Sequence, residues 1–123
     1  MSVLIDTNIL IDLLNGHPQA RTYLRDVGQI NISAITHYEV LAGCIDGRTK
    51  QLKAAEILLS VCNVIPVSAD ISALAAGYQR KQKAKRKMAD FLIEATAEQN
   101  GLQLATRNPQ DFKRTQTVCP YVL

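Results

Sequence analysis

Apolar residues follow two spacings along the chain, and their alternation predicts strands followed by helices. Compact β-branched and apolar runs, typical of buried strands, occupy residues 3–5, 30–33, 61–67, 102–105 and 118–122. Apolar residues three or four positions apart predict helices after Asp6, after Ser33, and over residues 50–60, 68–80 and 88–100. Pro66 lacks a backbone donor, so the third strand is expected at an edge of the sheet.

The order of these elements determines the fold class that we expect. Successive strands are separated by helical segments too long for hairpins, which predicts right-handed crossover connections and a mostly parallel sheet. Helices would then cover both faces of that sheet. The sequence therefore predicts an α/β fold, a three-layer α/β/α sandwich formed by a single domain over residues 1–123.

The composition is that of a globular protein. Hydrophobic residues make up 47% and charged residues 20%, which excludes the disordered and fibrous classes. No apolar run approaches the ~20 residues that span a bilayer, and Asp6 and Asp12 stand where a signal peptide would be basic and then apolar. We therefore expect a soluble, cytoplasmic protein with no membrane partner. Cys44, Cys62 and Cys119 are odd in number and widely spaced, which favours reduced thiols in the core.

Positive charge is concentrated in one segment. The formal net charge is only +3, but six of the eight residues from 80 to 87 are Lys or Arg. Such a run attracts polyphosphate chains electrostatically, and it is also typical of a solvated loop or helix end. The run alone leaves both interpretations open, although the acidic residue Asp90 just beyond it brings the run close to a candidate site.

Acidic residues follow several of the predicted strands. Asp6 comes directly after the first strand, Glu39 lies in the helix after the second, and Asp90 stands near the start of a helix. Asn108 and Asp111 follow the strand over 102–105. Ligands of open parallel sheets bind outside the carboxyl ends of the strands, so we expect these side chains at one rim. Taken singly, each acid also has a structural interpretation as a helix cap, an exposed helix position or a turn residue.

Carboxylates gathered at one rim need a cation. Two unit charges about 4 Å apart repel by roughly 4 kcal/mol at an effective dielectric constant near 20. Mg²⁺ and Mn²⁺ prefer oxygen ligands, and Mg²⁺ commonly takes one or two carboxylates while keeping several waters. The predicted rim is therefore a candidate site for one or two Mg²⁺ or Mn²⁺ ions.

Four segments form an ordered set of motifs. Residues 3–14 read VLIDTNILIDLL, residues 32–36 and 39–43 read ISAIT and EVLAG, residues 90–97 read DFLIEATA, and residues 105–112 read ATRNPQDF. In this order they resemble the segments that carry the first, second, third and closing acids of the PIN-domain family, and in particular of its VapC-like toxins. Each string is weakly specific, but their order and spacing over nearly the whole chain are strongly so.

The resemblance implies which residues would bind the metal. Asp6, Glu39 and Asp90 match the principal ligands of the family. The fourth acid is shared between the positions of Asn108 and Asp111, and many members have Asp where this chain has Asn108. Asp111 would then carry the fourth charge, or a second metal would be held weakly.

Glu94 departs from the family, which usually has a small residue at this position. It lies four residues after Asp90 and so shares its helix face. Glu94 would either add a ligand to the site or form an exposed salt bridge to Lys87 or Arg86, and we expect the salt bridge.

The resemblance also implies the activity, that of a metal-dependent endoribonuclease in which an activated water attacks a phosphodiester in line. Secondary roles in orienting a ligand or the water are expected of Thr7, Asn8, Thr106 and Asn108. Contacts to the RNA backbone are expected of basic residues, because phosphate contacts give affinity that is largely independent of sequence. These basic residues are Arg80, Lys81, Lys83, Lys85, Arg86, Lys87 and Arg107.

Toxins of this kind usually form homodimers and are inhibited by a small antitoxin that covers the site, so we expect both partners in addition to RNA. Two rival classes stay open. The amide at Asn108 suggests a catalytically weak or inactive PIN-fold RNA-binding protein. A phosphoacceptor domain would also place acids at strand ends, but it would need an Asp pair at the first strand and a Lys after the last, and neither is clear in this sequence.

Overall fold

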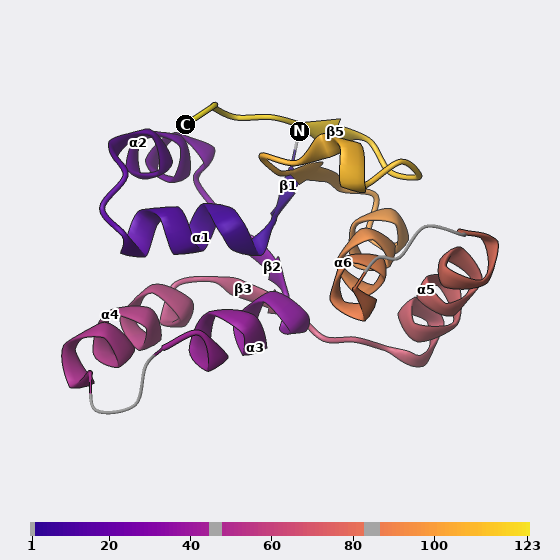
Figure 1. The fold of residues 1–123 in the computed structure, drawn as a ribbon, viewed down its shortest axis with the longest axis horizontal. Helices are drawn as coiled ribbons and strands as arrows, with labels where there is room; N and C mark the ends of the chain where they lie inside the picture. Colours follow the sequence, from indigo (N-terminus) through magenta and orange to yellow (C-terminus); the bar gives the residue numbers. More distant parts are fainter. Residues whose placement is uncertain (1, 45–47, 83–86) are drawn as a thin grey trace.

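A computed structural model describes residues 2–44, 48–82 and 87–123. Within these residues, five short strands form one sheet in the order β3-β2-β1-β4-β5, and every neighbouring pair is parallel. The parallel sheet predicted from the sequence is thereby confirmed (Figure 1). The strands are β1 (Val3–Ile5), β2 (Asn31–Ser33), β3 (Asn63–Ile65), β4 (Gln103–Ala105) and β5 (Thr117–Val118).

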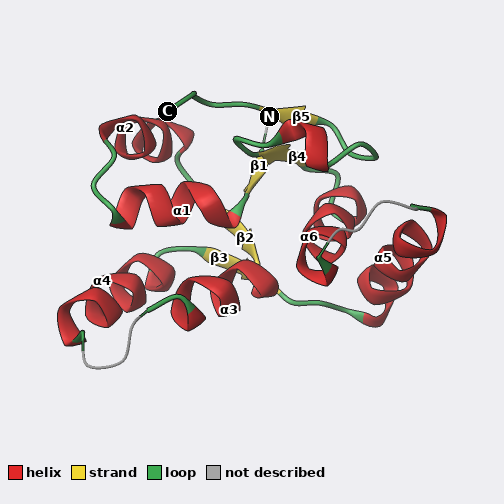
Figure 2. Cartoon of the chain, in the orientation of Figure 1, coloured by secondary structure: helices red, strands yellow, loops and turns green. Residues whose placement is uncertain are grey.

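Helices cover both faces of the sheet, so the predicted three-layer α/β/α sandwich is also confirmed. Helices α1 to α4 lie on one side, and α5 and α6 lie on the other (Figure 2). Their bounds are α1 (Thr7–Leu14), α2 (Pro18–Val27), α3 (Ala34–Ala42), α4 (Thr49–Ser60), α5 (Ala69–Lys81) and α6 (Met88–Gln99). A single turn of 3₁₀ helix, η1 (Pro109–Asp111), follows β4.

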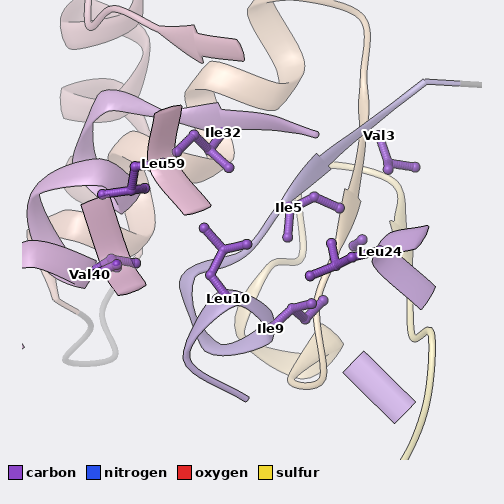
Figure 3. Close-up of a cluster of buried hydrophobic side chains, with 10 residues drawn as sticks. Val3, Ile5, Ile9, Leu10, Leu24, Ile32, Val40 and Leu59 are labelled. Carbon is purple, nitrogen blue, oxygen red and sulfur yellow. The ribbon is translucent and has the colours of Figure 1, made fainter. Parts of the chain in front are cut away.

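The central strand β1 is buried on both faces, and its side chains alternate between the two layers. Val3 and Ile5 join a cluster beneath α1 to α4 that includes Ile9, Leu10 and Leu24 (Figure 3). Leu4, which has no exposed surface, points to the other layer, where it joins a cluster of Ile93, Ala97, Leu104 and Phe112. A third cluster joins α5 to α6 through Ile71, Ala75, Phe91 and Ala95.

Serine caps begin two of the predicted helices. The Ser33 hydroxyl accepts a hydrogen bond from the Ile35 N–H at 3.0 Å, and the Ser68 hydroxyl accepts one from the Ile71 N–H at 3.2 Å. Each satisfies a backbone donor that has no partner inside the helix. These caps explain why α3 and α5 begin within a residue of their predicted starts.

The structure corrects three expectations. Helix α2 was not predicted, although it begins at Pro18, a residue favoured in the first turn. Strand β5 ends at Val118 instead of reaching residue 122, because Pro120 has no N–H to donate to a sheet. Cys119 is exposed and is not a core thiol, whereas Cys44 and Cys62 pack against the core as expected.

Strand β3 lies at the edge of the sheet, as was predicted from Pro66. No helix in the described ranges has the length and apolar character needed to cross a membrane.

Candidate active site

A cleft of about 540 Å³ opens where the parallel strands β2, β1 and β4 end. These three strands are neighbours, so the segments that follow them meet at one edge of the sheet. Helix α6 lies in the opposite layer (Figure 1). It brings Asp90 to the same cleft. The lining residues are Asp6, Thr7, Asn8, Ile11, Glu39, Lys87, Asp90, Asn108, Asp111 and Phe112. The structure therefore brings together all four predicted metal-ligand positions, together with Asn108.

Asp6 is both the N-cap of α1 and part of the cleft. Its side chain is 5% exposed. Oδ1 accepts a hydrogen bond from the Thr7 N–H at 2.8 Å, and Oδ2 accepts one from the Thr106 hydroxyl at 2.7 Å. The structural and functional interpretations of Asp6 are thus compatible, because the cap fixes the carboxylate at the edge of the cleft.

The pKa of Asp6 is raised above its usual value. Burial is the main cause, because it disfavours the charged form, and the charges of Asp90 and Glu39 raise the pKa further. The hydrogen bonds from Thr106 and Thr7 oppose this shift but do not cancel it. Three carboxylates from separate segments are therefore close enough to repel one another.

Glu39 reaches the cleft from the middle of α3 and is oriented by Thr7. The Thr7 hydroxyl donates to Glu39 Oε1 at 2.7 Å and lies 2.9 Å from the Thr36 hydroxyl. A carboxylate accepts only, so the Thr7 proton points to Glu39 and Thr36 supplies the second hydrogen bond. Thr7 and Thr36 together hold Glu39 beside Asp6.

Asn108 and Asp111 lie on the segment that leaves β4. The Asn108 N–H donates to Thr106 Oγ1 at 3.0 Å, and the same hydroxyl donates to Asp6. Asp111 is exposed at the end of η1, where its N–H is bonded to the Asn108 carbonyl at 3.0 Å. Asn108 is thus linked to Asp6 through Thr106, while Asp111 occupies the outer part of the cleft.

The donors in this cleft suit a divalent cation. They are carboxylate and amide oxygens, which are the ligands that Mg²⁺ and Mn²⁺ prefer. A cation would also favour the charged form of Asp6, whose pKa is raised by burial and further by the charges of Asp90 and Glu39. Among the described residues, no three acidic, histidine or cysteine side chains already converge on one point. A small number of direct carboxylate ligands with waters completing the shell matches the usual binding of Mg²⁺.

The predicted basic residues are distributed over three regions. Lys87 is exposed and lines the cleft. Arg80 and Lys81 are exposed in the last turn of α5. Lys83, Lys85 and Arg86 lie outside the described residues. Arg107 is turned to Asp12, with its Nε 2.6 Å from Asp12 Oδ2, and it does not line the cleft.

Glu94 has a different environment from the one expected. Its side chain has no exposed surface and does not line the cleft, so the expected exposed position is wrong. Its Oε2 accepts a hydrogen bond from the Arg114 N–H at 2.9 Å, and the Arg114 guanidinium lies 3.9 Å from Oε1. Arg114 also bonds Gln82 at 2.6 Å and lies over the Tyr78 ring. Within the described part of the chain, Glu94 thus connects α6 to the segment after η1.

Comparison with known proteins identifies this arrangement. The family model of the PIN domain matches residues 3–118. The chain belongs to the PIN domain family. Its relatives include Ribonuclease VapC10 of Mycobacterium tuberculosis, which is 31% identical over 96% of this chain and 91% of the relative. Ribonuclease VapC1 of Rickettsia felis is 32% identical over 94% of this chain and 92% of the relative.

Solved structures agree with the PIN-domain assignment. A chain from a toxin-antitoxin complex of Klebsiella pneumoniae is 37% identical, covers 99% of this chain and 100% of its own length, and superposes with a TM-score of 0.84. A chain of VapBC2 from Rickettsia felis, bound to a DNA fragment from its promoter, superposes with a TM-score of 0.83 at 23% identity. That second likeness supports the fold alone.

Several residues around this PIN-domain cleft were given no role in the sequence analysis. Ile11 and Phe112 form apolar parts of its lining. Their positions in a helix and a loop did not predict that they would face the cleft. Asp12 was named as an acid that a signal peptide would lack and as part of the first motif, but it was given no role at the site. Its buried contacts with Arg107 and Tyr121 join residues about a hundred positions apart, which spacing along a single sequence does not reveal.

Proposed function

We propose that this PIN domain is a metal-dependent endoribonuclease and acts as the VapC-like toxin of a toxin-antitoxin pair. The observation that carries the proposal is that Asp6, Glu39 and Asp90 come from separate segments and line one cleft. Burial raises the pKa of Asp6, and the charges of Asp90 and Glu39 raise it further. Relatives named ribonuclease VapC match nearly the whole chain, which supports RNA as the substrate class.

The residues of the cleft have separable tasks in this proposal. Asp6, Glu39 and Asp90 would hold Mg²⁺ or Mn²⁺, with Asp111 contributing at the outer edge. A divalent ion held there supplies an activated water and neutralises negative charge that develops on the phosphodiester. In this hydrolysis, the oxygen of water forms a new P–O bond as one P–O ester bond breaks. The proton that water loses is balanced by one that the leaving oxygen takes up.

Threonine hydroxyls would orient the carboxylates for this work. The Thr106 hydroxyl holds Asp6 Oδ2, and the Thr7 N–H holds Asp6 Oδ1. The Thr7 hydroxyl holds Glu39 Oε1. Asn8 and Asn108 line the cleft with amide groups that can donate to phosphate oxygens or to a water. Such outer contacts keep ligand positions constant during metal binding and so preserve affinity.

Among the described basic residues, Lys87 is the one best placed to bind RNA, because it lines the cleft beside the acids. Arg80 and Lys81 would extend the contact along the end of α5. Neutralising a phosphate contact on single-stranded RNA lowers the salt slope of binding by about 0.7. We expect Lys87→Gln to flatten the slope by that amount, measured by fluorescence anisotropy in chelator. An unchanged slope would mean that Lys87 is a solvated residue that does not contact RNA.

A small antitoxin that covers the cleft is the proposed protein partner, and a homodimer is the proposed assembly. The chain in the Klebsiella pneumoniae complex that resembles this one over its full length belongs to a toxin-antitoxin pair, which supports the first proposal. Because the proposed substrate is cellular RNA, we expect the protein to act in the cytoplasm. Co-expression with the product of the adjacent gene would test the antitoxin: rescue of growth supports it, and continued toxicity contradicts it.

Cleavage of a fluorescent single-stranded RNA by the purified protein tests the activity. We expect cleavage with Mg²⁺ or Mn²⁺ and none with chelator. Attack by water leaves a linear phosphate monoester, whereas attack by the neighbouring 2′-hydroxyl leaves a cyclic phosphate. Analysis of the product ends therefore separates this mechanism from a contaminating metal-independent ribonuclease.

A matched pair of variants makes the test specific. Asp6→Asn removes a ligand charge inside the cleft, and Asp26→Asn removes the same charge from an exposed position whose side chain is 69% exposed. We expect loss of cleavage in the first variant only. RNA binding without cleavage in the native protein, at any metal concentration, would instead favour the inactive RNA-binding alternative.

A further inference from the structure

Two adjacent residues that follow β4 are each bonded to an acid of α1. Thr106 donates to Asp6 Oδ2 at 2.7 Å. Arg107 donates through Nε to Asp12 Oδ2 at 2.6 Å and through Nη2 to Asp12 Oδ1 at 3.2 Å. Asp6 caps α1, and Asp12 lies in its second turn. The segment after β4 is therefore attached to α1 at two points.

The second attachment is buried and geometrically specific. Asp12 is 4% exposed, and its Oδ2 also accepts a hydrogen bond from the Tyr121 hydroxyl at 2.8 Å. Burial, followed by this hydrogen bond, raises the pKa of Tyr121, so the phenol stays protonated and donates. A bidentate guanidinium–carboxylate pair fixes orientation as well as distance. Three donors thus hold the Asp12 carboxylate in one position.

The attachment lies next to residues that line the cleft. Arg107 is flanked by Thr106, which bonds Asp6, and by Asn108, which lines the cleft. The turn η1 follows directly and presents Asp111. A rotation of the backbone at Arg107 would therefore move Asn108 and Asp111 relative to Asp6.

We propose that Asp12 and Arg107 are positioning residues whose ion pair sets the placement of Thr106, Asn108 and Asp111 against Asp6. Arg107 then acts through Asp12 and makes no contact with RNA, contrary to the expectation from its charge. The guanidinium is already used by the Asp12 carboxylate, and Arg107 does not line the cleft. This inference rests on the proposed nuclease function.

Steady-state kinetics on a fluorescent single-stranded RNA tests the proposal in Asp12→Asn and Arg107→Lys. Lysine keeps the positive charge but loses the bidentate geometry. We expect kcat to fall about 10- to 100-fold in both variants, because a misplacement of about 1 Å can cost on the order of 10²-fold. KM and the salt slope of RNA binding should stay at their native values, and more Mn²⁺ should be needed for half-maximal cleavage.

Controls separate the ion pair from its surroundings. Tyr121→Phe removes one bond to Asp12 and leaves the guanidinium pair, so its loss of kcat should be smaller than that of Asp12→Asn. The double variant Asp12→Asn/Arg107→Gln should lose no more than the larger single loss, since both residues act as one unit. Arg107→Gln alone leaves the buried Asp12 carboxylate without its cation. If Arg107→Gln does not fold, the kinetics of Arg107→Lys provide the test.

Two results would overturn the proposal. An increase in KM with a flatter salt slope in Arg107→Gln, and no change in Asp12→Asn, would make Arg107 an RNA contact. A lower melting temperature with native kcat, KM and Mn²⁺ requirement, measured where the variants are folded, would make the pair purely structural.

If the native protein cleaved no RNA, the proposed function would fail, and hydrogen exchange of the metal-free protein would still test the positioning. We expect the amide of Asn108, which donates to Thr106, to exchange faster in Asp12→Asn while the amides of β1 keep their native rates. Native exchange at Asn108 would count against the inference independently of any activity.

Discussion

Two carboxylates of the same helix are almost equally buried and yet have opposite surroundings. Asp6 is 5% exposed and Asp12 is 4% exposed. Asp6 is bonded to a backbone amide and a hydroxyl, and its pKa is raised by burial and further by the charges of two other acids. Asp12 is bonded to a guanidinium and a phenol. Asp12 thus has a cationic partner within the protein, whereas Asp6 has neutral hydrogen-bond donors and lines a cleft with two other acids.

This difference bears on where the proposed cation would bind. A buried carboxylate is costly unless it is paired, and Arg107 supplies the pair for Asp12. Among the described residues, no Lys or Arg forms an ion pair with Asp6, whose carboxylate is held by hydrogen bonds from Thr7 and Thr106. A divalent cation in the cleft would compensate its charge. The comparison therefore supports the proposed roles, a structural one for Asp12 and metal binding for Asp6, and it can be tested at each residue.

The largest expected effect is the loss of cleavage in Asp6→Asn. Metal ligands support several kcal/mol of charge stabilisation in the transition state, so we expect a decrease of at least about 10²-fold in kcat/KM. Asn is an equally good N-cap, so circular dichroism should show a native fold. Near-native cleavage in this variant would remove Asp6 from the site.

The next effect is on the free energy of unfolding. It should fall when Asp12 loses its partner and should stay the same or rise when Asp6 loses its charge. Arg107→Gln leaves Asp12 buried without a cation, and we expect the free energy of unfolding to fall by about 2–3 kcal/mol, below the range for fully buried pairs. The side chain of Arg107 is 26% exposed, which is the reason for the lower figure. Asp6→Asn in chelator should be as stable as the native protein or more so. Urea denaturation measures both, and destabilisation of similar size in the two variants would contradict the comparison.

A smaller effect is expected from the metal itself. Mn²⁺ at ten times its dissociation constant should raise the free energy of unfolding by about 1.4 kcal/mol, because it binds only the folded form. Asp90→Asn should melt at or above the native temperature in chelator and gain less from Mn²⁺. Differential scanning fluorimetry gives both quantities. An equal gain in the two proteins would make Asp90 a helix-terminal charge and not a ligand.

The smallest effect is a dependence on pH. In chelator, the raised pKa of Asp6 means that the folded state binds more protons than the unfolded state between the usual value of 3.8 and the raised value. Ionised Asp6 therefore destabilises the fold above this window, and the penalty is relieved as the pH falls through it. The melting temperature of Asp6→Asn minus that of the native protein should shrink from pH 7 to pH 4. A difference that grows on acidification would show that ionisation of Asp6 stabilises the folded protein.

The sequence predicted the layers and the gathering of acids, because both follow from local patterns. Strand ends in a parallel sheet share one edge, so the acids after β1, β2 and β4 meet there whatever the details of packing. Helix α2 was missed although Pro18 and the apolar residues Ala20, Leu24 and Val27 have helical spacing. The sequence pattern of residues 18–27 is therefore sufficient to predict this helix.

Contacts between distant segments were the part that the sequence could not supply. Glu94 has the sequence position of an exposed helical acid, and only tertiary packing against Arg114 makes it buried. Arg107 was predicted from its charge to contact RNA, although in the fold its guanidinium is bonded to Asp12. Both cases concern a charge whose partner lies far along the chain, and a single sequence contains no periodicity that links the two.

The central place of β1 in the sheet has a consequence for biosynthesis. β1 is made first, but its neighbour β4 begins at Gln103, and the bond from Thr106 to Asp6 spans 100 residues. Contacts of such separation form late in folding because the closure of long loops is entropically costly. A nascent chain still lacking β4 has its first three acids, Asp6, Glu39 and Asp90, but neither Thr106 nor the segment after β4. The cleft can therefore assemble only after almost the entire domain has left the ribosome, which delays cleavage competence until translation of this domain is nearly finished.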